Sequence, residues 1–317
     1  MNKLAYIAGL AISSVAMAGS YTEGADVGGS KGSAAIVSAW ANGETITGTV
    51  SSSSDLDYYR VSSASAPAGI YRHRVNLAGG SGGRYSTRGT GVSSASDVNF
   101  NSDRISGEYL TWYDFGNAAE IYLRAGRSGS GSNGYIMTHA VNAVTPTPAG
   151  SLGLGVHTFA SVLVGDSEIY LYDGAFNLIG QNDSQVAGDV RAKMTYNFTT
   201  AGTFYIAIGS GNSSTHVGTN TTPGYSNDVN NPFYDSNVGS GARTVILDFA
   251  GLVSRPENLS RTASEFGLSI DSGAGINHSA NVGGQELAWF SITVVPAPSS
   301  LALVGLAGVA AARRRRA

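Results

Sequence analysis

The chain has 317 residues, a formal net charge of −3 at neutral pH and no cysteine. Only 13% of its residues are charged, and no basic stripe lies outside the C-terminal tail, which argues against nucleic acid as a partner. Because there is no cysteine, a disulfide framework is excluded, and packing and sheet hydrogen bonds must stabilise the fold.

The N-terminal residues 1–18 have the layout of a secretory signal peptide. Lys3 supplies a positive charge, and a mostly apolar run follows from Leu4 to Val15. Ala16 and Ala18 then form a small-residue cleavage site before Gly19. We therefore expect a signal-peptide helix that is removed on export.

The body of the chain, residues 19–295, is built from short apolar and aromatic runs separated by turn residues. Examples are Ile121–Leu123, Ile169–Tyr172 and Phe204–Ile208, each bounded by Gly, Asn, Asp or Ser. Helical periodicity is nearly absent. This pattern predicts an all-β fold of one or two jelly-roll-like antiparallel β-sandwich modules.

Two early strands carry titratable residues. Asp55 and Asp57 share one strand face, where they could contact calcium, but a solvated edge is the preferred interpretation. His73 lies between two arginines and is likewise expected on a solvated face. The five histidines include no pair with metal-ligand spacing, so the sequence indicates neither zinc nor a catalytic dyad.

A possible calcium loop follows. Its oxygen-bearing residues copy the spacing of a calcium-binding loop and are Asp97, Asn99, Asn101, Asp103 and Glu108. Position 6 is Ser102, where the sharp turn requires glycine. The alternative is an extended strand whose polar side chains all face solvent. The sequence predicts no cofactor, and calcium at this loop is the alternative.

An internal repeat indicates two related modules. Residues 109–126 align without gaps on residues 192–209, with Tyr113 over Tyr196 and Tyr122 over Tyr205. Both copies are expected to be strand, tight turn, strand. The predicted division is a first module at 19–145, a Pro-rich linker at 146–151 and a second module at 152–295.

Aromatic side chains offer a hypothesis of sugar binding. Residues 212–241 are predicted to be a loop insertion in the second module, and Tyr225, Phe233 and Tyr234 lie within it. Trp112, Tyr113 and Tyr122 are a second candidate platform. Apolar ring faces in such sites stack on sugar C–H faces, although core packing is the default for Trp112 and Tyr113.

The C-terminal residues 296–317 form a sorting tail. Pro296 and Pro298 precede a short apolar helix at 301–312, and a positive stop follows at Arg313, Arg314, Arg315 and Arg316. The apolar run is short for a stable membrane span. This layout resembles the PEP-CTERM sorting signal of Gram-negative bacteria, with Ala297 in place of the family's Glu. The resemblance implies transient insertion in the inner membrane and processing by an exosortase-type enzyme.

Short motifs in the body resemble the bacterial pre-peptidase C-terminal (PPC) family of β-sandwich modules. They are the Asp-x-Asp-aromatic-aromatic strand at 55–59, the strand and Gly turn at 169–174, and Gly-Thr-Phe-Tyr at 202–205. The resemblance covers roughly residues 45–145 and 152–250, and it implies the sandwich fold rather than an activity.

These observations predict an exported, non-catalytic structural or adhesive protein of the cell surface or extracellular matrix, with exopolysaccharide as a possible partner. An extracellular carbohydrate-binding module is the alternative. A secreted hydrolase whose catalytic residues form no visible sequence motif is the third hypothesis.

Overall fold

The computed structural model describes residues 20–24, 26–88, 105–118, 120–162, 167–182, 191–210, 233–234, 252–254, 267–277 and 287–296. Their regular structure is β-strand, apart from one 3-10 turn, η1 (Lys31–Ser33). The all-β expectation is therefore confirmed. The two terminal helices expected from the sequence lie outside these residues.

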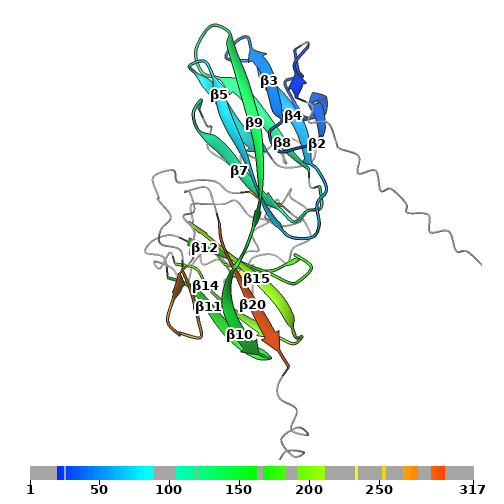
Figure 1. Cartoon of the computed structure of the whole chain (residues 1–317). Coiled ribbons are helices and arrows are strands. Elements are labelled where there is room, and N and C mark those ends of the chain that lie inside the picture. The colour runs from blue at the N-terminus through cyan, green and yellow to red at the C-terminus, as the bar shows by residue number, and fades with distance from the viewer. Residues whose placement is uncertain are drawn as a thin grey trace, which may run out of the picture.

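Two sheets form a first sandwich (Figure 1). One has the order β1-β3-β9-β5-β7-β17, with bounds β1 (Tyr21–Thr22), β3 (Thr45–Val50), β5 (Ile70–Gly79), β7 (Tyr109–Asp114), β9 (Asn133–Val144) and β17 (Leu252–Ser254). The other has the order β2-β4-β8-β6, with β2 (Ala35–Trp40), β4 (Asp57–Ser63), β6 (Gly83–Arg88) and β8 (Glu120–Arg127).

A second sandwich follows in the chain. Its larger sheet has the order β10-β20-β15-β12-β13-β16, with β10 (Thr147–Gly153), β12 (Ser167–Tyr172), β13 (Leu178–Asn182), β15 (Gly202–Ser210), β16 (Phe233–Tyr234) and β20 (Ala288–Val295). Its smaller sheet has the order β14-β11-β18-β19, with β11 (Gly155–Ser161), β14 (Lys193–Phe198), β18 (Gly267–Ile270) and β19 (Ile276–Asn277).

Each sandwich encloses its own apolar core. Strand side chains alternate between faces, so every second residue points between the sheets. In the first sandwich, Trp112 of β7 and Tyr59 of β4 belong to one buried cluster, to which they contribute from opposite sheets. In the second, Phe159 of β11 packs with Phe290 of β20. Burial of this apolar surface is the main term that stabilises each sandwich.

The two sandwiches share one pattern of strand pairing. The order β2-β4-β8-β6 corresponds to β10-β20-β15-β12, and β3-β9-β5-β7 corresponds to β19-β18-β11-β14. Corresponding neighbours pair in the same sense, including the parallel pairs β2–β4 and β10–β20. However, β3 and β4 come early in the first sandwich, whereas β19 and β20 come last in the second. Apart from the leading edge strand, the second sandwich is thus a circular permutation of the first.

The sequence repeat falls on equivalent elements of the two sandwiches. Its first copy covers β7 and β8, and its second copy covers β14 and β15. The expected order of strand, turn, strand is confirmed in both copies. In each copy the two strands belong to different sheets, so the turn carries the chain across the sandwich rather than closing a hairpin.

The segment predicted to be a linker is mostly strand. Residues 147–153 form β10, which pairs in parallel with β20, and Figure 1 shows β9 leading directly into it. β10 is an edge strand, where the missing N–H of Pro148 is tolerated. The register shifts between Pro148 and Ser151, and Gly150 there has φ +105°. Edge position and bulge together explain why a Pro-containing segment is strand.

A third buried cluster joins the two sandwiches. Tyr113 and Phe115 of the first sandwich pack against Trp289 of β20 and Tyr172 of β12. The ring centroids of Phe115 and Trp289 are 6.1 Å apart in an edge-to-face arrangement, and the Tyr113 hydroxyl accepts a 2.9 Å hydrogen bond from the backbone N–H of Leu287. We call this cluster the aromatic junction. It fixes the first sandwich on the outer face of the second.

Candidate functional site

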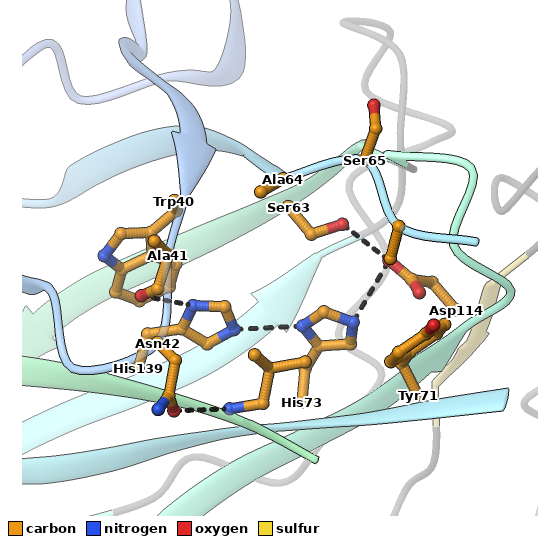
Figure 2. A pocket seen from close by; sticks show the side chains of 12 residues that line it. Trp40, Ala41, Asn42, Ser63, Ala64, Ser65, Tyr71, His73, Asp114 and His139 are labelled. Atoms are coloured by element: carbon orange, nitrogen blue, oxygen red, sulfur yellow. Dashed lines mark hydrogen bonds and ion pairs between the residues drawn. The ribbon is translucent and has the colours of Figure 1, made fainter. Parts of the chain in front are cut away.

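One end of the first sandwich contains a cavity of about 160 Å³, which we call the histidine cavity (Figure 2). It lies beside the ends of β2, β4 and β7 and against β5 and β9. Its polar lining comes mainly from His73, Asp114 and His139, with Trp40 and Tyr71 as walls. The histidines are on strands β5 and β9, whose alternation places them between the sheets.

A row of polar contacts, three hydrogen bonds and one contact between His73 and Asp114, runs through this cavity lining. The Ser63 hydroxyl donates to Asp114 Oδ2 at 2.5 Å, and His73 Nε2 lies 3.0 Å from the same oxygen. His73 Nδ1 is 2.9 Å from His139 Nε2, and His139 Nδ1 is 3.1 Å from the carbonyl oxygen of Ala41. Figure 2 shows all four links as one continuous row.

The Ala41 end of this row fixes the direction of its hydrogen bonds. A backbone carbonyl can only accept, so His139 donates to Ala41 from Nδ1. When His139 is neutral, its Nε2 carries no hydrogen and accepts from His73 Nδ1. At the other end, the Asp114 carboxylate accepts from the Ser63 hydroxyl.

The pKa values at the two ends of the row are both lowered, but by different causes. Burial, reinforced by the neighbouring His73, lowers the pKa of His139 to about 4. Burial alone would raise the pKa of Asp114, but His73, the Ser63 hydroxyl and the Gly116 N–H together hold that pKa below its usual value.

Aromatic stacking holds both imidazoles in place. His139 stacks on Trp40 with a centroid distance of 4.4 Å, and His73 stacks on Trp112 at 5.0 Å. The rings are thereby held in one orientation from both sheets. In this arrangement the polar atoms of the two rings are directed at their neighbours in the row.

The structure corrects two interpretations of the histidines. His73 was expected on a solvated face, yet it is only 1% exposed. Sequence spacing indicated no histidine pair, yet His73 and His139 are in direct contact across neighbouring strands. A signal was present: alternation puts His73 opposite Arg72 and Arg74 and on the same face as the apolar Val75 and Leu77.

The solvated-edge interpretation of Asp57 is also wrong, because Asp57 is fully buried. Its Oδ2 accepts a 2.6 Å hydrogen bond from the Tyr135 hydroxyl, which in turn lies 2.6 Å from the Tyr59 hydroxyl. Burial chiefly, with repulsion from Glu23 and other carboxylates, raises the pKa of Asp57 to about 7 against the opposing Tyr135 bond. Asp55 instead accepts from the N–H and hydroxyl of Ser51.

Most of the expected calcium loop lies outside the described residues, namely Asp97, Asn99, Asn101 and Asp103. Glu108 is described, and its Oε2 accepts a 2.9 Å hydrogen bond from the N–H of Ile105 within a short turn before β7. The cleavage site at Ala16 and Ala18, and the tail from 297 onward, are outside as well.

The strand-borne sugar platform is excluded by burial. Trp112, Tyr113 and Tyr122 are each no more than 2% exposed, the first in the core and the second in the aromatic junction. Of the loop aromatics, Tyr225 is outside the described residues, and Phe233 and Tyr234 are described only as the backbone of β16.

No protein-family model matches this chain, and no curated protein matches it either. Within the described residues, the chain contains no helix of the length and apolar character that a membrane span requires.

Proposed function

We propose that this chain is an exported, non-catalytic structural or adhesive protein of the surface or extracellular matrix of a Gram-negative bacterium. The observation that carries the proposal is the aromatic junction. It joins two sandwiches into one continuous β body through buried rings and a hydrogen bond between Tyr113 and Leu287. Such a body keeps its shape without disulfides, which suits a scaffold or an adhesive spacer.

The contacts made in the histidine cavity support a non-catalytic role. Ser63 donates to the Asp114 carboxylate and not to an imidazole, so no ring nitrogen is placed to take its proton. The rings bond to each other, to Asp114 and to the backbone. Groups that are directed at one another in this way contribute to the fold and leave little for a substrate.

The boundary between body and tail supports sorting at the C-terminus. Strand β20 ends at Val295, and Pro296 follows as an exposed residue. The last described strand therefore ends directly before the segment that resembles the PEP-CTERM signal. Removal of the tail by an exosortase-type enzyme would leave every described strand intact.

The test is the intact mass of the protein from each cell fraction of a Gram-negative host that carries an exosortase-type enzyme. We expect a surface or medium species that begins at Gly19 and has lost the Arg313–Arg316 stop. The variant Ala297→Glu, which restores the family's Pro-Glu-Pro, is expected to be processed at least as completely. Replacing the four arginines by glutamine is expected to abolish processing. The unprocessed chain in the cytosol would contradict the proposal.

A further inference from the structure

Three carboxylates converge at the opposite end of the first sandwich from the histidine cavity. They belong to Glu23 and Asp26, in the segment after β1, and to Asp57 at the start of β4. One oxygen from each lies within 4.8 Å of the others. Such a group is repulsive unless a proton or a cation compensates it.

The buried member of the group lacks a full set of partners. Asp57 is 0% exposed, and although Oδ2 accepts from Tyr135, its Oδ1 has no hydrogen-bond partner. A buried carboxylate oxygen left without a donor is costly. Because Tyr135 donates to Asp57, Tyr59 must donate to Tyr135. The hydroxyls are thus oriented to support a carboxylate in its ionised form.

The surroundings hold the other ligands and keep the space open. Glu23 is fixed from both sides, since Oε1 accepts from the N–H of Val27 at 3.0 Å and Oε2 from the N–H of Thr49 at 2.6 Å. Gly48 lies beside the group. A Cβ at that position would come within 2.6 Å of Glu23 Oε2 and 2.4 Å of the Tyr135 hydroxyl. Glycine therefore leaves room where any other residue would crowd the carboxylates.

We propose that Glu23, Asp26 and Asp57 bind a calcium ion. All the donors are hard oxygens, which excludes a preference for zinc or copper. Three oxygens within 4.8 Å of one another need to move together by only a few tenths of an ångström to share one ion at the Ca–O distance of about 2.3–2.6 Å, and Asp26, which is exposed, leaves positions for water. Magnesium would require a tighter octahedron and retains more of its water.

The ion would fasten the N-terminal segment to the sandwich. Glu23 and Asp26 lie between β1 and Val27, and the side chain of Val27 is buried in the first core. Asp57 is on β4, which belongs to the opposite sheet from β1. A calcium ion between them links two sheets and the start of the mature chain. This site differs from the loop at 97–108 expected from the sequence, and it stands independently of the proposed surface role.

The test is calorimetric titration of the metal-free full chain with CaCl2, with MgCl2 in parallel, together with melting curves in calcium and in chelator. We expect calcium to bind, and at saturating calcium to raise the melting temperature by roughly 5 °C, with magnesium weaker. Asp26→Asn removes an exposed ligand without disturbing the core, and should weaken calcium binding roughly tenfold or more. A second readout is terbium luminescence sensitised by Tyr135, which Tyr135→Phe should reduce.

The matched control is Asp55→Asn, a nearby carboxylate outside the group, which should bind calcium like the wild type. Glu108→Gln distinguishes the two calcium hypotheses. Absence of any calcium effect in the wild type would overturn the proposal. So would calcium binding that Glu108→Gln abolishes and Asp26→Asn leaves unchanged.

Discussion

At the scale of single residues, the first sandwich places charge where apolar packing is expected. His73, His139 and Asp114 are each no more than 2% exposed. They are tolerated because each has a partner at hydrogen-bond distance. Without such a partner, burial would shift the protonation equilibrium of each group toward its neutral form. The stability of this region should therefore depend on pH.

His139 gives the clearest pH dependence. In the unfolded chain its pKa returns to about 6.5, whereas burial holds the folded pKa near 4. Between these values the unfolded state binds more protons, so the free energy of unfolding falls as pH drops, by up to about 3 kcal/mol. His139→Gln should lose this dependence. The measurement is urea unfolding at intervals from pH 7 to pH 4.

The control is Met137→Ala, two residues earlier on β9 and fully buried on the same face. It should be destabilised about equally at every pH in this range. The raised pKa of Asp57 makes its own contribution to stability increase as pH falls, opposite to that of His139. Because Asp57 is present in the wild type and in both variants, comparison with the wild type isolates the contribution of His139. If His139→Gln kept the wild-type slope, the assignment would be wrong.

The same residues show what local patterns can and cannot predict. Alternation puts Asp57 on the face of Tyr59 and Val61, and His73 on the face of Val75, so the burial of both residues could be predicted from the sequence. The contact between His73 and His139 could not be predicted, because it depends on β5 and β9 being neighbours in the sheet. The two histidines are 66 residues apart in the sequence and are brought together by the pairing of strands, which the local sequence pattern does not specify.

At the scale of elements, the turn after β7 determines how the chain crosses from one sheet to the other. Gly116 has φ +81°, and its N–H donates to Asp114 Oδ1 at 3.0 Å. A Cβ here would lie 2.4 Å from the carbonyl oxygen of Pro67. The turn therefore needs glycine both for its backbone conformation and for its close packing.

Gly116→Ala should destabilise the protein by about 2–4 kcal/mol, from strain at positive φ together with overpacking. Gly43 is a matched control, because it has φ +85° but open space around its Cβ position. Gly43→Ala should cost only about 1–2 kcal/mol. Chemical denaturation measures both. Equal losses would show that the contact with Pro67 contributes nothing.

Strand positions were the part of the fold most accessible from sequence. Runs such as Ile121–Leu123 and Phe204–Ile208 lie in β8 and β15 as expected, because β-branched and aromatic alternation is a local signal. The segment at 146–151, expected to be a linker, lies mostly in strand β10. Pro148 suggests a break in the sheet, but an edge strand accommodates it.

At the scale of the whole molecule, the two sandwiches are related by strand pairing more than by sequence. The sequence repeat covers only β7–β8 and β14–β15, although the five strands β5 to β9 and their counterparts β11, β12, β14, β15 and β18 follow the same chain order. Packing between the sandwiches was equally inaccessible, because Tyr113 and Trp289 come from different modules. The aromatic junction is expected to make the two sandwiches unfold together.

Trp289 and Phe290 provide the last test, because they are neighbours on β20 that point to opposite faces. Trp289 belongs to the aromatic junction and Phe290 to the second core, and both are fully buried. Either change to alanine should cost about 3–5 kcal/mol. Phe290→Ala should give a single calorimetric unfolding transition at a lower temperature, since the junction still couples the sandwiches. Trp289→Ala should give two separate transitions, one for each sandwich. A single transition in both variants would mean that the junction does not carry the coupling.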